Sequence, residues 1–281
     1  MLVKAYAKIN WALNVTGTRE DGYHLLDMLV QRIELCDDIS ISPCDEMVFE
    51  SDDPGLAMDE RNLVVRAAYA LKNACAVSQN AHIRLNKRIP SQAGLGGGSA
   101  DAAATLMGLN EFWKTGLSIE QLAEIGVKLG ADVPLCLYPG LMRVSGIGEV
   151  IEEAKCEESL PLLIIQPDAG LSTAEIFKRY DLCADQKHAN IDEAVMAYSQ
   201  RNYQRLFASC HNQLQRTAAE MLPEIASCVG ALYQKGADFA QMTGSGSCVF
   251  GVFLEEEKAL LAKEALKDIY PVCILTKTRC R

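Results

Sequence analysis

A glycine-rich loop between a strand and a helix constrains the fold of this chain more than any other feature of its sequence. Residues 81–89 alternate apolar and polar side chains as a strand does, and residues 99–112 have the composition of an alanine-rich helix. The loop between them, P-S-Q-A-G-L-G-G-G-S, has glycines at positions 94, 96, 97 and 98. Glycines let a backbone approach a ligand closely, and the first N–H groups of a helix attract anions. The loop therefore predicts a phosphate-binding turn.

Two well-known nucleotide motifs do not describe this loop. A Walker A loop would continue with Gly-Lys followed by Ser or Thr, and a dinucleotide fingerprint would have G-x-G-x-x-G spacing; neither occurs here. The plainer alternative is a flexible turn whose helix has Ser99 as its N-cap. Taken alone, the loop leaves both interpretations open.

The length and composition of the chain favour two domains. It has 281 residues, of which 49% are hydrophobic, near the upper limit for one core. The first half is rich in strand patterns, whereas the second half passes from helices to a sheet. We therefore expect an α+β protein with domains at 1–155 and 156–281.

The charge and the apolar pattern exclude several classes of protein. The net charge of −10 opposes general attraction to nucleic acid or to an anionic membrane. The N-terminus has no apolar signal segment, and no stretch reaches the ~18 apolar residues of a membrane span. The eleven cysteines are scattered and form no C-x-x-C pair, so we expect reduced thiols and no zinc site. The sequence thus predicts a soluble, cytoplasmic protein.

Periodicity assigns the other elements. We expect strands at residues 3–15, 25–35, 39–42, 47–50, 160–166, 239–242, 248–254 and 272–276. We expect helices at residues 63–74 and 256–267, and a run of helices before residue 236. Two patterns resemble capping boxes, Ser118 with Gln121 for a helix that ends near Gly130, and Ser172 with Glu175.

Two charged residues are candidates for chemistry. Lys8 lies centrally in the first strand, and Asn10 follows on the same face because side chains alternate with a period of two. An arbitrary lysine there would most often be a solvated surface residue. Asp132 stands in G-A-D-V-P, where it could be the N-cap of a short helix with Pro134 in its first turn. Capping and catalysis are compatible at that position.

Three motifs in order along the chain resemble those of the GHMP kinases. They are A-K-I-N-W-A-L at residues 7–13, the glycine loop, and T-G-S-G-S-C-V-F-G at residues 243–251. Four segments, A-K-I-N, D-G-Y-H from Asp21, N-K-R-I-P from Asn86 and G-A-D-V-P from Gly130, are similar to the branch that phosphorylates a cytidyl diphosphate ester of methylerythritol. That branch belongs to the non-mevalonate isoprenoid pathway. The family loop more often begins Pro-x-Gly-Gly-Gly-Leu. Ser91, Gln92 and Ala93 depart from this pattern and remove two glycines at the loop entrance, which affects the expected nucleotide contacts there.

The resemblance implies a fold and a reaction. The fold would combine an N-terminal domain like domain 2 of ribosomal protein S5 with a ferredoxin-like C-terminal domain. The reaction would transfer the γ-phosphoryl group of ATP to the 2-hydroxyl of the substrate, with Asp132 as general base and Lys8 stabilising the developing charge. Mg²⁺ would accompany ATP, and the sequence identifies no protein ligand for it beyond a guess at Ser99.

The resemblance also implies binding residues. The ATP contacts would come from the loop, at Pro90, Gly94, Leu95, Gly96, Gly97, Gly98, Ser99 and Ala100. The substrate contacts would come from Asn10, Tyr23, His24, Lys87, Thr173, Phe177, Gly244 and Ser245. Tyr23 and Phe177 could sandwich a cytosine, with His24 bonding its polar edge. Without the resemblance, Phe177 would be read as a core residue, and Tyr23 and His24 as ordinary residues after a turn.

Other functions stay open at this point. The chain could be another kinase of the family, of the homoserine or mevalonate kinase type, or a nucleotide-binding or RNA-binding module without catalysis on the same scaffold. The negative charge opposes RNA binding, and the presence of both Lys8 and Asp132 opposes a silent module. The partners expected are therefore the small-molecule substrate and ATP, in a monomer or a homodimer.

Overall fold

The computed structural model describes residues 1–20, 22–182 and 187–280. The chain forms two compact units, each built from separate segments. The first unit comprises residues 1–7, 35–91 and 96–138, and the second comprises residues 8–34, 92–95 and the chain from Pro139 onward. The long strands β1 (Leu2–Thr18) and β2 (His24–Cys44), which pair with each other, therefore contribute residues to both units. The domain boundary near residue 155 stays a prediction.

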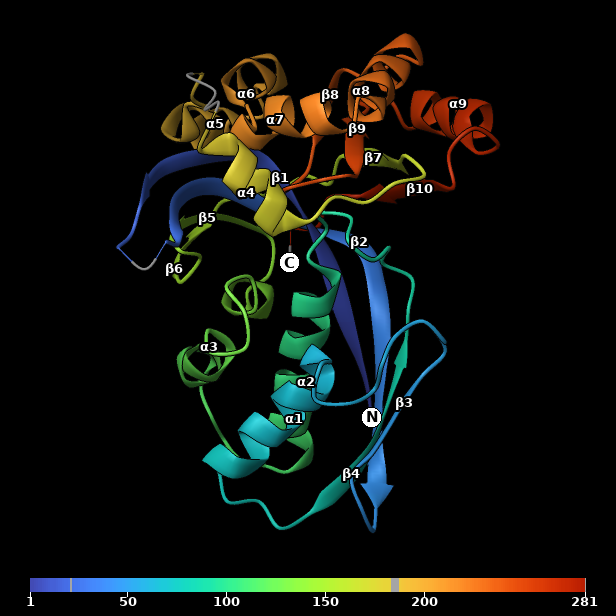
Figure 1. Cartoon of the computed structure of the whole chain (residues 1–281). Helices are drawn as coiled ribbons and strands as arrows, with labels where there is room; N and C mark the ends of the chain where they lie inside the picture. The colour runs from blue at the N-terminus through green and yellow to red at the C-terminus, as the bar shows by residue number, and fades with distance from the viewer. Residues whose placement is uncertain (21, 183–186, 281) are drawn as a thin grey trace. The chain divides into compact units, whose positions relative to one another are not determined.

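The first unit combines sheet strands with packed helices (Figure 1). In it, residues 38–44 of β2 pair antiparallel with β4 (Asn80–Asn86), which pairs in parallel with β3 (Val48–Ser51). Helix α2 packs against each of its helical neighbours. The helices are α1 (Leu63–Ala74), α2 (Gly97–Phe112), α3 (Ile119–Gly126) and the short 3₁₀ helix η1 (Pro134–Leu137).

The second unit contains a four-stranded antiparallel sheet in the order β10-β7-β9-β8. Its strands are β7 (Pro161–Gln166), β8 (Phe239–Met242), β9 (Val249–Val252) and β10 (Val272–Lys277). Helices lie between β7 and β8 and between β9 and β10, which with this strand order is the ferredoxin-like arrangement. The α+β class and the ferredoxin-like half are both confirmed.

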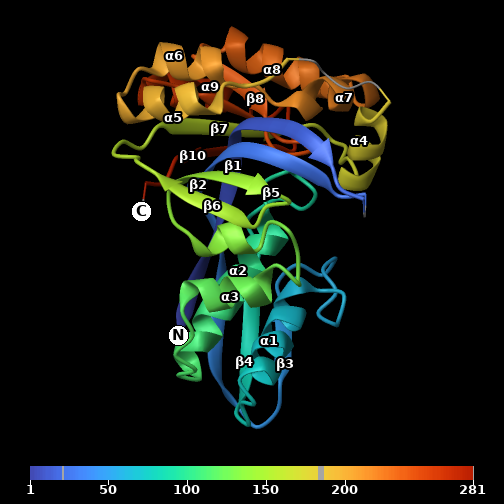
Figure 2. The same cartoon turned by 90° about the vertical axis from the view of Figure 1, so that its left-hand side faces the viewer.

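Helices cover one face of this sheet (Figure 2). Helix α8 packs on β8 and β9, and α9 packs on β7 and β10. The helices of this unit are α4 (Thr173–Tyr180), α5 (Ile191–Ser199), α6 (Tyr203–Ser209), α7 (Gln213–Met221), α8 (Glu224–Gln234) and α9 (Glu256–Leu266).

An aromatic cluster around Trp11 fills the core of the second unit. The indole is fully buried, and its ring lies 5.7 to 6.3 Å from four other rings, those of Tyr198, Phe207, Phe239 and Phe250. Its Nε1 donates to Gln31 Oε1 at 2.7 Å, so the one polar atom of the indole is satisfied. The odd positions of β1 thus face a core, as the period of two predicts.

The structure corrects several expected elements. The strands expected at residues 25–35 and 39–42 are one continuous strand, β2, because two adjacent acids inside it, Asp37 and Asp38, are held by ion pairs rather than ending it. Strands β5 (Leu141–Gly146) and β6 (Val150–Ala154) were not expected, and β5 pairs with residues 26–31 of β2.

Helix ends also differ from expectation. The capping box of Ser118 and Gln121 forms, but α3 ends at Gly126 rather than near Gly130. Ser172 is the N-cap of α4, yet its side chain makes no capping hydrogen bond, so the second capping box is wrong. In these two helices, the local sequence predicts the N-cap residue correctly, but it does not predict whether the side chain of that residue makes a capping hydrogen bond.

The cysteines are not all reduced thiols. Cys156 and Cys280 form a disulfide, with Cα atoms 5.1 Å apart and 124 residues between them in sequence. No local spacing could indicate this pair, because the two residues are brought together only by the fold. Eight other cysteines are free, and Cys183 lies outside the described residues. Among the described residues, no helix is both long and apolar enough to cross a bilayer.

Close helix-to-sheet packing in the first unit depends on Gly108 of α2. A Cβ there would lie 2.6 Å from Ile41 Cδ1 and 2.8 Å from Val3 Cγ2. We expect Gly108→Ala to lower the free energy of unfolding by ~1–3 kcal/mol, because the strands must move to admit the methyl group.

The matched control for this substitution is Gly230→Ala, in α8, where a Cβ would meet nothing within 4 Å. That variant should gain roughly 0.5–1 kcal/mol from the better helix propensity of alanine. Urea denaturation of both variants measures the difference. Equal effects at the two positions would contradict the packing role of Gly108.

Candidate active site

A buried lysine on β1 is the first element of the site. Lys8 is 5% exposed, and its Nζ donates to Asn10 Oδ1 at 2.8 Å on the same face of the strand. An ammonium group kept from water must be held by polar partners, or its burial would be costly. Lys8 is therefore a placed cation and not the solvated lysine of the plainer interpretation.

The turn between β8 and β9 is fastened beside this lysine. Asn10 N donates to Thr243 Oγ1 at 3.1 Å, and Gln241 Nε2 donates to the carbonyl oxygens of Asn10 and Trp11. Asn212, fully buried, donates from Nδ2 to the carbonyl oxygens of Met242 and Gly244, both at 2.9 Å. A Cβ on Gly244 would lie 3.1 Å from Lys8 Nζ, so the turn reaches the cation only because residue 244 has no side chain.

The first part of the glycine loop, residues 92–95, belongs to the same unit. Lys8 N donates to Leu95 O at 3.0 Å, and Cys248 N donates to Ala93 O at 3.3 Å. Gly94 has φ +72°, and a Cβ built on it would lie 2.1 Å from Thr243 O. Gln92 has φ +52°, a left-handed conformation that glycine adopts more easily, at one of the positions that depart from the family pattern.

The second part of the loop belongs to the first unit and begins α2. Gly96, in the left-handed region, is the N-cap, and no side chain caps this helix. The plainer alternative, with Ser99 as the N-cap, is therefore wrong about the cap, since Ser99 is inside the first turn. The leading N–H groups of an α-helix have no intrahelical acceptors, which suits them to an anion. A Cβ on Gly97 would meet Ile89 Cγ2 at 3.0 Å, so a side chain there would crowd the segment that leads into the loop.

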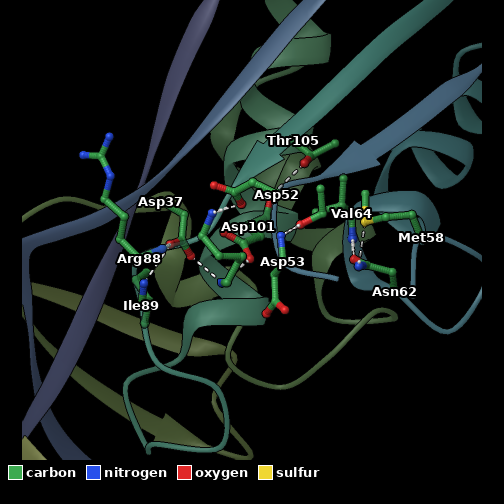
Figure 3. A network of polar contacts seen from close by, with 12 residues as sticks. Asp37, Asp52, Asp53, Met58, Asn62, Val64, Arg88, Ile89, Asp101 and Thr105 are labelled. Carbon is green, nitrogen blue, oxygen red and sulfur yellow. Dashed lines mark hydrogen bonds and ion pairs between the residues drawn. The ribbon is translucent and has the colours of Figure 1, made fainter. Parts of the chain in front are cut away.

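An ion-pair cluster of Asp37, Lys87 and Asp101 supports this part of the loop (Figure 3). Lys87 Nζ binds both Asp37 Oδ2 and Asp101 Oδ2, the latter at 2.9 Å. The other oxygen of Asp37 accepts hydrogen bonds from the backbone N–H groups of Arg88 and Ile89. The cluster thus connects β2, the end of β4 and α2 directly before and after the glycine loop.

Burial changes the protonation of this cluster. Removal from water raises the pKa of Asp101 to about 8, with Lys87 opposing the rise and Asp37 adding to it. Burial lowers the pKa of Lys87, but the two carboxylates outweigh it and the net direction is upward. Asp101 Oδ1 is buried without a hydrogen-bond partner among the described residues. Two carboxylates around one ammonium leave an excess negative charge, which a proton on Asp101 would remove.

Asp132 lies in the first unit, between α3 and η1, and is half-buried. The N-cap of η1 is Val133, so the capping interpretation of Asp132 is wrong. Lys8 belongs to the other unit, and the pairing of these two residues stays a prediction. Lys87 lies in the ion-pair cluster, and its expected substrate contact likewise stays a prediction.

Three elements of the second unit bring the other expected substrate residues together. The His24 ring stacks on Phe177, with centroids 4.6 Å apart and planes at 24°. His24 Nε2 also bonds Asp181 Oδ1 at 2.7 Å, and Thr173 Oγ1 bonds Ser245 Oγ at the same distance. Tyr23 is 59% exposed next to His24, and Asp21 of the D-G-Y-H segment lies outside the described residues.

The sequence did not single out several residues that build this site. Asp37 and Asp101 hold Lys87, Thr243 and Asn212 hold the turn, and Asp181 holds His24. The one local signal was the position of Asp101 just after the glycines. Among the described residues, no group of three or more His, Cys, Asp or Glu side chains could hold a metal ion.

Comparison with known proteins identifies the class. Residues 62–140 match the family model of the GHMP kinases N terminal domain, and residues 196–272 match that of the GHMP kinases C terminal domain. A 4-diphosphocytidyl-2-C-methyl-D-erythritol kinase of Thermoanaerobacter pseudethanolicus is 37% identical over 276 residues, which cover 98% of this chain and 95% of that protein. The chain belongs to the GHMP kinases, and it is an ATP-dependent kinase, as the motifs indicated.

Three further comparisons refine the similarity. A protein of the same name from Clostridium tetani is 36% identical over 279 residues, or 99% of this chain and 100% of that protein. A crystal structure of 4-(cytidine 5'-diphospho)-2C-methyl-D-erythritol kinase is similar over the full length of both chains, with a TM-score of 0.85 and 27% identity. A homoserine kinase from Cytophaga hutchinsonii has a TM-score of 0.75 at 17% identity, covering 99% of this chain and 94% of that one, and shows the fold alone.

The contact of Gly94 with Thr243 predicts a large effect of substitution. We expect Gly94→Ala to lower the free energy of unfolding by more than ~3 kcal/mol, because the methyl group overlaps a backbone oxygen as well as straining φ. Urea denaturation measures the loss.

Gly116→Ala is the matched control, since Gly116 has φ +70° and a Cβ there would meet nothing within 4 Å. It should cost only the left-handed strain of ~1–2 kcal/mol. Similar losses in the two variants would contradict the close approach.

The cluster predicts a pH dependence of stability. The folded-state pKa of Asp101 is about 8 and lies above the unfolded value of ~3.9, so the folded state binds the extra proton between these pH values. The stabilising contribution of Asp101 to the free energy of unfolding is fully present below pH ~4 and is lost as the pH rises through about 8.

Asp101→Asn imitates the protonated acid and should flatten the fall of unfolding free energy between pH 5 and 8, measured by urea denaturation at each pH. Asp192→Asn, at a carboxylate whose side chain is 84% exposed, should keep the slope of the natural chain. An unchanged slope in Asp101→Asn would refute the assignment.

Proposed function

We propose that this kinase transfers the γ-phosphoryl group of ATP to the 2-hydroxyl of 4-(cytidine 5'-diphospho)-2-C-methyl-D-erythritol, in the non-mevalonate isoprenoid pathway. The observation that carries the proposal is the buried ammonium of Lys8, held where the loop at Gly94 meets the turn at Gly244. The near full-length relatives named for this substrate support the choice of alcohol. We place the reaction in the cytoplasm, where ATP is supplied.

Phosphoryl transfer depends mainly on positioning and on compensation of charge. ATP supplies the phosphoryl group when it is bound. Lys8 would balance the negative charge that grows on the transferred group, from a fixed position that costs no reorganisation. Asp132 would accept the proton of the substrate hydroxyl as general base. The buried hydrogen bond from Lys8 to Asn10 supports the first of these roles.

The glycine loop suits the phosphates of ATP. Its contacts would come from Pro90, Gly94, Leu95, Gly96, Gly97, Gly98, Ser99 and Ala100. The uncapped start of α2 at Gly97 supports this role, because its leading N–H groups are offered to an anion. Mg²⁺ would accompany ATP and neutralise its β and γ oxygens.

The cytidyl substrate would be held by residues from several separate segments of the chain. Its contacts would come from Asn10, Tyr23, His24, Lys87, Thr173, Phe177, Gly244 and Ser245. The stacked rings of His24 and Phe177, next to the exposed Tyr23, support an aromatic site for a base. The hydrogen bond between Thr173 and Ser245 connects α4 with the glycine turn near that site.

An ADP-release assay with a panel of alcohols tests the proposal. The cytidyl diphosphate compound should be turned over, whereas homoserine and mevalonate should not. ADP release with homoserine or mevalonate but not with the cytidyl compound would overturn the substrate assignment.

In the same assay, Asp132→Asn should lower kcat by about a hundredfold or more, because the amide cannot accept the proton. Its affinity for ATP, measured by calorimetry, should change little. Lys8→Met should lose kcat comparably through loss of the charge. Near-natural kcat in Asp132→Asn would remove the general base from the mechanism.

A further inference from the structure

His24 is held in one orientation by two side chains of a single helix. Its ring stacks on Phe177, and its Nε2 bonds Asp181 Oδ1 at 2.7 Å. Phe177 and Asp181 are four residues apart at the end of α4, so they lie on the same side of the helix. The helical bond from Asp181 N to Phe177 O, at 3.0 Å, fixes the spacing of ring and carboxylate.

Asp181 lies at a position where its carboxylate would destabilise the helix. It is the C-cap of α4, and a carboxylate near a helix C-terminus opposes the helix dipole. Lys178 and Arg179, in the last turn, are the charges that such a position favours. The placement of an acid is explained by its bond to His24, whose side chain is only 11% exposed, whereas that of Asp181 is 51% exposed.

The pair also fixes the tautomer of His24. An ionised carboxylate can only accept, so Nε2 must carry the hydrogen and Nδ1 of the neutral ring is then an acceptor. The same device, an acid on the far nitrogen, orients histidines in metal sites. Without the acid, the ring could rotate away from Phe177 and exchange tautomers. Ligand binding would then have to order the ring, and the lost entropy would weaken the binding free energy.

We infer that Asp181 is a positioning residue for base recognition, which keeps His24 flat on Phe177 in one tautomer before the nucleotide binds. This inference rests on the proposed function, since it gives Asp181 a role in selecting the cytidyl substrate. Asp181 itself does not touch the substrate; it acts through His24. ATP binding and the phosphoryl transfer step do not depend on it.

Steady-state kinetics tests the inference. Asp181→Ala should raise the KM for the cytidyl substrate about tenfold, equivalent to ~1.4 kcal/mol of binding free energy, with kcat and the KM for ATP within about twofold. Asp181→Asn keeps an acceptor oxygen and should recover most of the affinity. Glu175→Ala is the matched control, because it removes a carboxylate from the first turn of the same helix and should leave all constants unchanged.

Nitrogen NMR of the histidine rings supplies a readout that does not require turnover. The chain has four histidines, so His24→Gln assigns the His24 signals. The natural chain should show hydrogen on Nε2, and Asp181→Ala should show a mixture of tautomers and weaker binding of CDP by calorimetry.

The outcomes separate the inference from the proposed function. An active natural chain with unchanged KM values in Asp181→Ala overturns the inference alone, as does an unchanged tautomer. A natural chain that releases no ADP with the cytidyl compound overturns the proposed function instead. A general loss of kcat and of both affinities in Asp181→Ala would show a merely structural role and would also overturn the inference.

Discussion

The contact between Gly94 and the carbonyl oxygen of Thr243 is the constraint on which the lysine part of the site depends. Two segments 149 residues apart touch there, and a Cβ at residue 94 would lie 2.1 Å from the oxygen. The Thr243 hydroxyl also donates a hydrogen bond to Gly94 O at 3.3 Å. Lys8 N bonds the next residue of the loop, and Asn10 bonds the hydroxyl of Thr243. The loop entrance at residues 92–95, strand β1 and the turn between β8 and β9 are therefore held together by hydrogen bonds and by this close contact.

The charged side chains around the glycine loop are held by partners within the chain. Two cations around the loop are paired: Lys8 with Asn10, and Lys87 with Asp37 and Asp101. The chain is acidic overall, with a net charge of −10, so a locally positive site for an anion must be created by fixed cations and by backbone N–H groups. Burial and the nearby carboxylate of Asp37 raise the pKa of Asp101 to about 8, which favours the neutral acid beneath the loop. Local arrangement, and not net charge, suits this acidic protein to bind a nucleotide.

The sequence predicted well the strands and helices that follow from apolar periodicity. It did not predict the features that depend on contacts with residues elsewhere in the chain. The strands at β1 and β8 and the helices at α1 and α9 follow from apolar spacing, within a few residues. The break expected within β2 does not exist, because Lys87 and Arg88 neutralise the acids there. The plainer interpretation of the loop put the N-cap of α2 at Ser99 because serine is a good cap, whereas the N-cap is Gly96, in the left-handed region. The disulfide of Cys156 with Cys280 has no local signal at all.

By itself, the sequence determined the class of the fold and the place of the glycine loop, because apolar periodicity and glycine spacing are local properties of the chain. It indicated the family through the resemblance of its motifs. It also named Lys8, His24 and Phe177, although for the last two it did so only through resemblance. Only the tertiary structure decided that His24 stacks on Phe177 and bonds Asp181, and that Lys87 lies between two acids. Such contacts join residues from 14 to 157 positions apart, and their geometry depends on how whole strands and helices pack rather than on any local pattern.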